Sequence, residues 1–215
     1  MRDDRPAGDV FNLVSIMTSD KQTIAVYDLR VDEYSKAFAK AKADPALSRF
    51  LSNLPQGARV LDLGCGPGTH AAAMHAQGYR VTAMDASIGM VELARTHQGL
   101  EVRHAEFSDL SDISVFDGVW ANFSLLHAPR NAFPQHLETI ATALNSNGLF
   151  HIGMKTGDGE KRDHLGRSYT FYSAEGLRNL LQSAGFAVLE ETVGKSAGLA
   201  GTVDPWIEIL ARLER

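Results

Sequence analysis

"VLDLGCGPGTH", residues 60–70, places three alternating glycines directly after an apolar run that carries one acid, Asp62. Glycine loses more conformational freedom on folding than any other residue, so a glycine cluster beside a buried strand needs a reason. In an open α/β sheet, glycines at the first strand-to-helix turn let the backbone approach a ligand and place a helix N-terminus beside it. We therefore predict that Gly64, Gly66 and Gly68 form a ligand-binding turn.

Short apolar runs alternate with helical stripes on both sides of this turn. This alternation is typical of an α/β fold with a mostly parallel sheet. The last two runs have no helical pattern between them, only "GKSAGLAGTVDP", so we expect them to pair as antiparallel neighbours. The seven runs are "ARVLDLG", "YRVTAMD", "LEVRHAEF", "FDGVWANF", "GLFHIGMK", "FAVLEETV" and "WIEILARLE".

The part of the chain before the glycine turn has a different pattern. Residues 1–20 are polar and are expected to fray, and residues 21–43 read as helical with lysines in the last turns. Pro45 interrupts this helix, and "PALSRFLSNL" predicts a second short helix before Pro55. We therefore divide the chain into a flexible N-terminus with a helical cap, residues 1–54, and one globular domain, residues 55–215.

Composition limits the classes of function. With 215 residues, 44% of them hydrophobic, the chain is long enough for one domain with a sizeable core. A net charge of −5 argues against sequence-independent binding of nucleic acid, so we expect no DNA partner. The single cysteine, Cys65, excludes an internal disulfide framework. No apolar run approaches membrane-helix length and no signal peptide is evident, so we expect a cytoplasmic protein.

The glycine spacing helps to identify the ligand. Asp85 ends the next run about 20 residues on, where a carboxylate would meet a ribose diol. In the dinucleotide fingerprint G-x-G-x-x-G/A, however, the final position falls on Thr69. Asp62 would also repel a pyrophosphate but attract an ammonium. A ligand with an adenosine, an amino-acid ammonium and a sulfonium is favoured, and an NAD(P)-dependent oxidoreductase is the less favoured alternative.

At these motifs the sequence resembles the class I S-adenosylmethionine-dependent methyltransferases. The resemblance covers about residues 57–193 and rests on "VLDLGCGPG", "VTAMDAS", "RHAEFSDL", "FDGVWANFSLLHAP", "ALNSNGLFHIGM" and "TFYSAEGLRNLLQSAGFAV". It implies a Rossmann-like, doubly wound, mostly parallel seven-stranded sheet with an antiparallel last strand and an N-terminal helical cap. It also implies the cofactor S-adenosyl-L-methionine.

The resemblance assigns cofactor roles to individual positions. Asp85 would bind the ribose, Glu106 and Phe107 would border the adenine, and Asn122 would lie close to the sulfonium. Cys65 is interpreted as a small pocket-lining residue. The remaining candidates are Asp62, Gly64 and Gly66 at the methionine part, and Met84, Ala86 and Ile88 on the purine face, where ordinary core packing is an equal alternative.

Methyl transfer needs orientation and exclusion of water, whereas a general base is optional. His127, just after the fourth run, is the best-placed base or substrate contact, with a loop histidine bound to backbone as the alternative. Tyr27 and Tyr34 are candidates to close over the methionine end, and simple helix packing explains them equally well. No metal-ligand spacing such as H-E-x-x-H occurs, so we expect no metal.

Residues 155–173 form an unusually long connection. We predict that it forms one wall of the acceptor pocket, with Arg167 and Tyr169 facing the substrate and Phe171 and Tyr172 either there or in an edge strand. A basic cluster, formed by Lys161, Arg162 and His164, would attract an anionic acceptor or simply be solvated. Of the other histidines, His70, His75, His97 and His136 are predicted on helix surfaces, and His104 and His151 in core or edge strands.

The substrate class follows from what the sequence lacks. "ANFSLL" is not the Asn/Asp-Pro-Pro-aromatic pattern of enzymes that methylate nucleobase amines, and no cysteine pair supports cytosine-C5 chemistry. We therefore expect a small-molecule acceptor, with its acceptor atom (O, N, S or C) undetermined. A protein or RNA substrate, or cofactor binding alone, is the alternative, and a monomer and a homodimer remain equally open.

Overall fold

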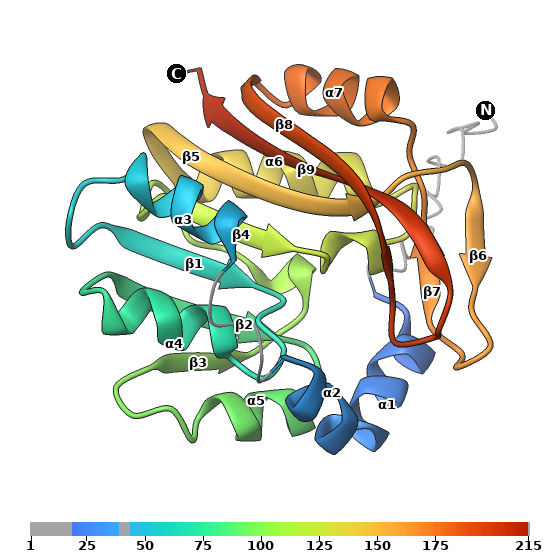
Figure 1. The fold of residues 1–215 in the computed structure, drawn as a ribbon. Helices are drawn as coiled ribbons and strands as arrows, with labels where there is room; N and C mark the ends of the chain where they lie inside the picture. The colour runs from blue at the N-terminus through green and yellow to red at the C-terminus, as the bar shows by residue number, and fades with distance from the viewer. Residues whose placement is uncertain (1–18, 39–43, 215) are drawn as a thin grey trace, which may run out of the picture.

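The fold was analysed in a computed structural model, which describes residues 19–38 and 44–214. A seven-stranded sheet in the order β3-β2-β1-β4-β5-β9-β8 runs through the molecule (Figure 1). Each of the seven apolar runs supplies one strand, so the prediction of seven strands is confirmed. The strands are β1 (Arg59–Leu63), β2 (Arg80–Asp85), β3 (Glu101–His104), β4 (Phe116–Asn122), β5 (Leu144–Lys155), β8 (Phe186–Ala197) and β9 (Val203–Leu213).

The register of the central strands brings their carboxyl ends to one edge of the sheet. Asp62 of β1 pairs with Ala83 of parallel β2 on one side and with Trp120 of parallel β4 on the other. The last strand of the chain, β9, is antiparallel to both of its neighbours, β5 and β8, as predicted. The strand order reverses at β1, and in such sheets this is where ligands bind.

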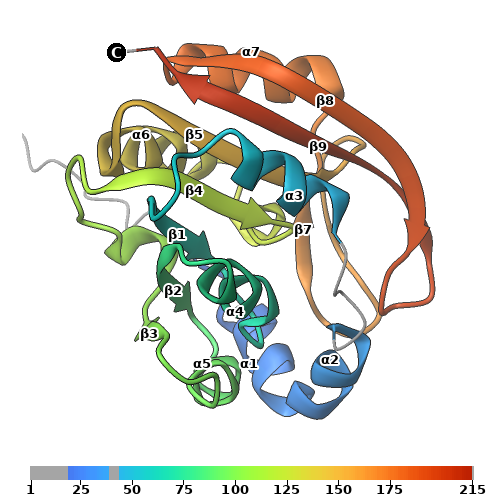
Figure 2. The same cartoon turned by 60° about the vertical axis from the view of Figure 1, so that its left-hand side comes forward.

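Helices cover both faces of the sheet (Figure 2). Neighbouring residues of a strand point to opposite faces, so Val60 packs in the core under α3 and α4, and Leu61 packs in the core under α6 and α7. The helices are α3 (Pro45–Ser52), α4 (Thr69–Ala76), α5 (Ile88–Ala94), α6 (Phe133–Ala143) and α7 (Ala174–Ser183). None of the helices in the described residues is long and apolar enough to cross a membrane.

The predicted continuous helix over residues 21–43 is wrong. The chain forms α1 (Lys21–Leu29) and α2 (Val31–Phe38), separated by Arg30, whose backbone N–H turns back to the Tyr27 carbonyl at 3.2 Å. The break has a physical basis in packing, because the bend lets both helices contact α5. Residues 39–43 of this prediction, and the N-terminus expected to fray up to residue 18, lie outside the described residues.

The long connection after β5 forms a small hairpin. Its strands β6 (Glu160–Arg162) and β7 (Ser168–Thr170) pair in antiparallel register beyond the carboxyl end of β5. Just after it, Tyr172 is buried against Phe133 of α6, with the ring centroids 4.8 Å apart. The segment therefore combines the two alternatives that the sequence left open, a pocket wall and packing on the core. The hairpin lies beside the edge of the sheet where ligands bind, and Tyr172 packs in the core.

Candidate active site

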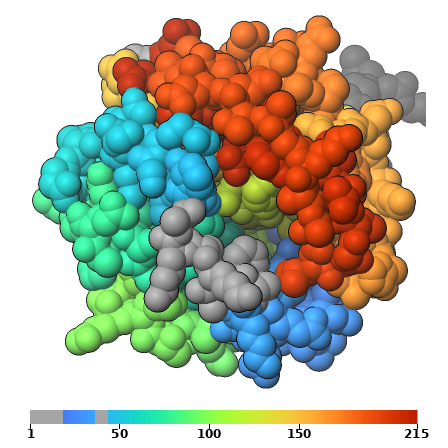
Figure 3. Space-filling view, viewed as in Figure 1, coloured from blue at the N-terminus to red at the C-terminus, as the bar shows by residue number. Residues whose placement is uncertain are grey.

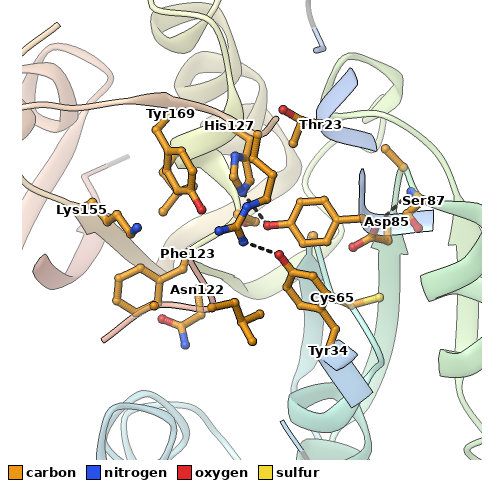
Figure 4. Close-up of a pocket in the computed structure, with 18 of the residues that line it drawn as sticks. Thr23, Tyr34, Cys65, Asp85, Ser87, Asn122, Phe123, His127, Lys155 and Tyr169 are labelled. Atoms are coloured by element: carbon orange, nitrogen blue, oxygen red, sulfur yellow. Dashed lines mark hydrogen bonds between the residues drawn. The ribbon is translucent and has the colours of Figure 1, made fainter. Parts of the chain in front are cut away.

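A cavity of about 510 Å³ lies at the carboxyl ends of β1, β2, β4 and β5. The cavity is also lined by residues of α1 and α2, of the β6–β7 hairpin and of the turn between β8 and β9. The space-filling view shows a hollow between β9 and the blue N-terminal helices (Figure 3). In close-up, Asp85 and Ser87 lie on one side of the cavity and Lys155, Phe123 and Tyr169 on the other (Figure 4).

The glycine turn closes the cavity floor. Gly64, Gly66 and Gly68 have φ values of +76°, +52° and +77°, in the left-handed region that favours glycine. A Cβ on Gly64 would lie only 2.3 Å from the Ser124 Cβ, because the turns after β1 and β4 approach each other there. Backbone conformation thus favours glycine at all three positions, and close approach also requires it at Gly64.

Asp85 connects the glycine turn to the start of α5. Its Oδ2 accepts the Gly66 N–H at 2.8 Å and its Oδ1 accepts the Ser87 N–H at 2.9 Å. Burial raises the pKa of the Asp85 carboxyl. A carboxylate has about four lone-pair sites, so two backbone bonds leave capacity for hydroxyl groups of a ligand. Ala86 and Ser87, the next two residues, also line the cavity.

Asp62 is a buried acid of the cavity that is only partly compensated by its surroundings. It is only 2% exposed, and its Oδ2 has no hydrogen-bond partner among the described residues. Burial raises its pKa to about 7. A buried carboxylate needs a cation or hydrogen-bond donors to offset its desolvation. A ligand ammonium in the adjoining cavity would supply that compensation.

The adenine candidates differ in their placement. Ala86 and Phe107 line the cavity, but Glu106 does not, because its side chain caps the single turn of 3-10 helix at Phe107–Asp109. Met84 is buried in the core and Ile88 is 41% exposed, and neither lines the cavity. Of the three residues predicted for the purine face, only Ala86 is therefore in place.

The other cofactor candidates differ in whether they line the cavity and in what they contact. Gly66 does not line the cavity, but its N–H holds Asp85. Cys65 lines the cavity and is buried, which raises the pKa of its thiol. Asn122 also lines it, with its Oδ1 3.2 Å from His151 Nε2. Burial lowers the pKa of His151 to about 3, so this neutral ring can hold the Asn122 amide in orientation.

The acceptor candidates from four segments meet at the other end of the cavity. The Tyr27 hydroxyl lies 2.6 Å from His127 Nε2, and the Tyr27 and Tyr34 rings are 4.7 Å apart. The Tyr169 ring lies 4.8 Å from the His127 ring. Arg167, from the same hairpin, donates to the Tyr34 hydroxyl. All five side chains line the cavity, so the predicted set is brought together.

Hydrogen bonding selects one tautomer of His127. Its Nδ1 lies 2.6 Å from the Ser168 carbonyl oxygen, which can only accept, so Nδ1 carries the proton. Nε2 then has a free lone pair, and the Tyr27 hydroxyl donates to it. Burial lowers the pKa of His127 to about 4, which keeps the ring neutral at physiological pH. The neutral ring therefore presents Nε2 as a hydrogen-bond acceptor toward the cavity.

Within the described residues, two lysine or arginine side chains line the cavity, and both are already paired. Arg167 donates to Asp163 Oδ2 from Nε at 2.9 Å and from Nη2 at 2.7 Å. Lys155 donates to Asp204 at 2.7 Å, and its Nζ stands 4.3 Å from the centre of the Tyr169 ring. Arg162 of the predicted basic cluster binds Asp20, and none of residues 161, 162 and 164 lines the cavity.

Sequence reasoning missed part of the cavity wall. Lys155 and Phe123 end apolar runs at the edge where the binding turn was predicted, so strand position was an available signal. Trp206 and Asp204 come from β9, which the antiparallel return of the chain brings over the cavity. No local pattern marks those two residues.

Two of the histidine predictions are wrong. His136 is buried rather than solvated, because it lies on the same helical stripe as Phe133, Leu137 and Ile140. His70 lines the cavity, with its Nε2 3.2 Å from Asp44 Oδ2. Burial disfavours a charge on His70, but Asp44 and Asp62 raise its pKa.

The other four histidines fall closer to their predicted positions. His75 is exposed on α4, whereas His97 is half-buried, with its Nε2 3.1 Å from the Pro67 carbonyl oxygen. His104 is exposed on the edge strand β3, and His151 is buried in the core. No cluster of metal-ligating side chains occurs in residues 19–38 and 44–214.

A family model described as a methyltransferase domain matches residues 35–191. The chain belongs to this family. The prediction of a Rossmann-like methyltransferase of the S-adenosylmethionine-dependent class is thus confirmed at the level of family and fold. A solved structure with the same fold is the 1,6-didemethyltoxoflavin-N1-methyltransferase of Burkholderia thailandensis, with bound 1,6-didemethyltoxoflavin and S-adenosylhomocysteine. It matches with a TM-score of 0.72 and 24% sequence identity, and the match covers 89% of this chain and 88% of that chain.

Two curated methyltransferases are similar in sequence. The O-methyltransferase cnsE of Penicillium expansum is 32% identical over 155 residues, which are 64% of this chain and 55% of that protein. The demethylmenaquinone methyltransferase of Clavibacter sepedonicus is 37% identical over 91 residues, 39% of this chain and 37% of that protein. The chain therefore spans about half of the length of the first of these curated relatives, and less of the second.

Proposed function

We propose that this chain transfers a methyl group from S-adenosyl-L-methionine to a small-molecule acceptor. The observation that carries the proposal is the pairing of two acids at one cavity. Asp85 binds the glycine turn and retains acceptor capacity, and Asp62 presents a buried carboxylate oxygen that has no hydrogen-bond partner in the described part of the chain. A ribose diol and an ammonium are the groups that such acids bind, and S-adenosyl-L-methionine carries both.

The residues of the cavity fit this cofactor from end to end. Asp85 would accept the ribose hydroxyls, and Asp62 would compensate the ammonium of the methionine part. Ala86 and Phe107 would flank the adenine, and the small Cys65 would leave room beside the glycine turn. Asn122, held by His151, would border the sulfonium. Glu106 and Gly66 would contribute through the loops they shape rather than by lining the cavity.

The bound cofactor supplies an electrophilic methyl group on a sulfonium. The protein residues orient the acceptor and exclude water, which is the main requirement of an in-line displacement. The helices α1 and α2 and the β6–β7 hairpin cover the acceptor end. His127 Nε2, whose lone pair accepts the Tyr27 hydroxyl in the structure, would take a proton from an acceptor group that replaces this hydroxyl.

A small acceptor agrees with the enclosure of the site. Tyr27, Tyr34 and Tyr169 line the cavity from three elements, and a cavity walled in this way would suit a small molecule better than a folded protein or a structured RNA. The relatives named above include methyltransferases of small molecules, which supports the same proposal. An NAD(P)-dependent oxidoreductase is disfavoured, because Asp62 would lie beside the pyrophosphate.

A thermal-shift comparison tests the proposal. S-adenosylhomocysteine and S-adenosylmethionine should raise the melting temperature, and NAD and NADP should not. A ligand at a hundredfold excess over its Kd stabilises the native state by about 2.7 kcal/mol. Stabilisation by NAD without a response to S-adenosylhomocysteine would overturn the cofactor assignment.

A further inference from the structure

Aromatic rings surround the acceptor end of the cavity (Figure 4). The rings of Phe123 and Trp206 meet edge to face, 6.4 Å apart at 87°, opposite the Tyr27 and Tyr34 pair. Tyr169 supplies a further ring, between His127 and Lys155. Rings of this kind pack best against another flat ring, by offset stacking and edge-to-face contact.

Charge at this end is balanced within the protein. Lys155 is paired with Asp204 and Arg167 with Asp163, each at 2.7 Å. Arg167 is only 3% exposed and also donates to the Tyr34 hydroxyl. A charged acceptor would therefore have to separate an existing ion pair before it gained one of its own. An uncharged acceptor leaves both ion pairs intact.

The hydrogen bonding of His127 indicates the reactive group. Its Nδ1–H is held by the Ser168 carbonyl, so its Nε2 can only accept. In the structure this lone pair receives the hydroxyl of a phenol, that of Tyr27, at 2.6 Å. The protein's own side chain thus displays the geometry of an aromatic hydroxyl bound to the base.

We propose that the methyl acceptor is an uncharged planar aromatic compound with a hydroxyl group, which binds among these rings and donates its O–H to His127 Nε2. This inference rests on the proposed function. The acceptor hydroxyl takes the place of the Tyr27 hydroxyl on Nε2. As the O–C bond forms, the S–C bond of the cofactor breaks and the sulfur keeps its electron pair. The hydroxyl proton moves to Nε2, and the resulting imidazolium returns it to solvent.

Four naphthalene probes test this acceptor class. They share one ring system and differ in the substituent: 2-naphthol, its methyl ether 2-methoxynaphthalene, the anion 2-naphthoate and the cation 2-naphthylmethylammonium. Binding is measured by calorimetry on protein saturated with S-adenosylhomocysteine. The saturation step tests the proposed function first, because a protein that does not bind S-adenosylhomocysteine contradicts that function. If S-adenosylhomocysteine binds but 2-naphthol is not the preferred probe, only this inference fails.

We expect 2-naphthol to bind about tenfold or more tightly than each of the other three probes, which corresponds to about 1.4 kcal/mol. With S-adenosylmethionine, 2-naphthol should yield 2-methoxynaphthalene. The inference is overturned if 2-naphthoate or the ammonium probe binds as tightly as 2-naphthol, or if no probe binds the saturated protein.

Variants locate the preference at His127. His127→Ala and His127→Gln should abolish the preference for 2-naphthol over 2-methoxynaphthalene while S-adenosylhomocysteine still binds. Tyr172→Phe is the control, because the Tyr172 hydroxyl is buried, has no hydrogen-bond partner within residues 19–38 and 44–214, and lies outside the cavity. A preference that survives in both His127 variants would show that the hydroxyl is recognised elsewhere, against the proposal.

Discussion

The Tyr27 hydroxyl donates to His127 Nε2 at 2.6 Å, although the two residues are 100 positions apart in the chain. This contact is one of several that hold α1 across the site. Asp20, at the start of α1, binds Arg162 of the hairpin, which lowers the pKa of Asp20 to about 2. Asp28, near its end, accepts from Ser87 at 2.5 Å. The helix α1 therefore connects the cofactor side to the acceptor side.

Tyr27→Phe should lower the free energy of unfolding by about 1–3 kcal/mol, because it leaves the buried His127 Nε2 without a donor. Tyr172→Phe makes the same chemical change where no hydrogen bond exists, and should have almost no effect. Urea denaturation of both variants measures the difference. Equal stability of the two variants would show that the Tyr27–His127 bond contributes nothing.

Asp28→Ala should accelerate the release of S-adenosylhomocysteine. Asp28 Oδ1 accepts from Ser87 Oγ and from the Gly89 N–H at 3.0 Å, and these bonds attach α1 to the start of α5. Loss of a charged acceptor of two donors costs about 1.5–3 kcal/mol, which corresponds to a release rate roughly 10- to 150-fold faster. Stopped-flow displacement measures the release, with Asp32→Ala as the charge control. An unchanged release rate would mean that α1 does not restrain the ligand.

Affinity for S-adenosylhomocysteine should depend on pH through Asp62. Its pKa is about 7 in the free protein, and only the ionised carboxylate compensates a ligand ammonium. Affinity should therefore reach a plateau above about pH 7 and fall by up to about tenfold per pH unit below it. Asp62→Asn should weaken binding and remove this dependence. Calorimetry over a pH series measures both effects, and a flat profile in the unmodified protein would contradict the assignment.

Asp62 should also affect the stability of the ligand-free protein. Burial raises the pKa of Asp62 in the folded protein to about 7, above the ordinary value of an aspartate, so the folded protein binds the proton more tightly than the unfolded chain. The contribution to stability is therefore present at low pH and is lost as pH rises toward about 7. Asp62→Asn should raise the melting temperature more at about pH 8 than at about pH 5. The reverse order would rule out a raised pKa.

Asp85→Ala should weaken S-adenosylhomocysteine binding by about tenfold or more and also lower stability by about 1–3 kcal/mol. The stability loss follows because the side chain accepts two backbone N–H groups, from Gly66 and Ser87. Asp85→Asn keeps one acceptor oxygen and should recover part of the stability but not the affinity. Calorimetry and thermal melting separate the two effects. Unchanged affinity in both variants would place the ribose elsewhere.

Gly64→Ala should destabilise the protein more than Gly66→Ala. Both glycines have positive φ, but a Cβ on Gly64 would lie 2.3 Å from the Ser124 Cβ, whereas a Cβ on Gly66 meets nothing within 4 Å. Left-handed backbone alone costs an alanine about 1–2 kcal/mol, so Gly66→Ala should lose about that and Gly64→Ala more. Urea denaturation compares them, and equal losses would mean that Ser124 moves away freely.

Local patterns were sufficient for the sheet and for part of the site. Strand periodicity and helix stripes have short repeats, so each strand could be predicted from its own residues. The glycine turn and Asp85 follow the ends of consecutive parallel strands, which meet at one edge in any such sheet. His136 lies on a visible helical stripe with Ile140, so its burial could have been predicted in the same way.

Only the tertiary structure decided the contacts between distant segments. Asp163 lies only four positions before Arg167, but the Tyr34 hydroxyl that also accepts from its guanidinium comes from 133 positions away, and no local pattern indicates that contact. The lone pair of His127 depends on the Ser168 carbonyl, which the hairpin brings to it from 41 positions away. Charge, tautomer and orientation depend on which groups meet across a cavity, and this is set by packing of the whole chain rather than by any local pattern.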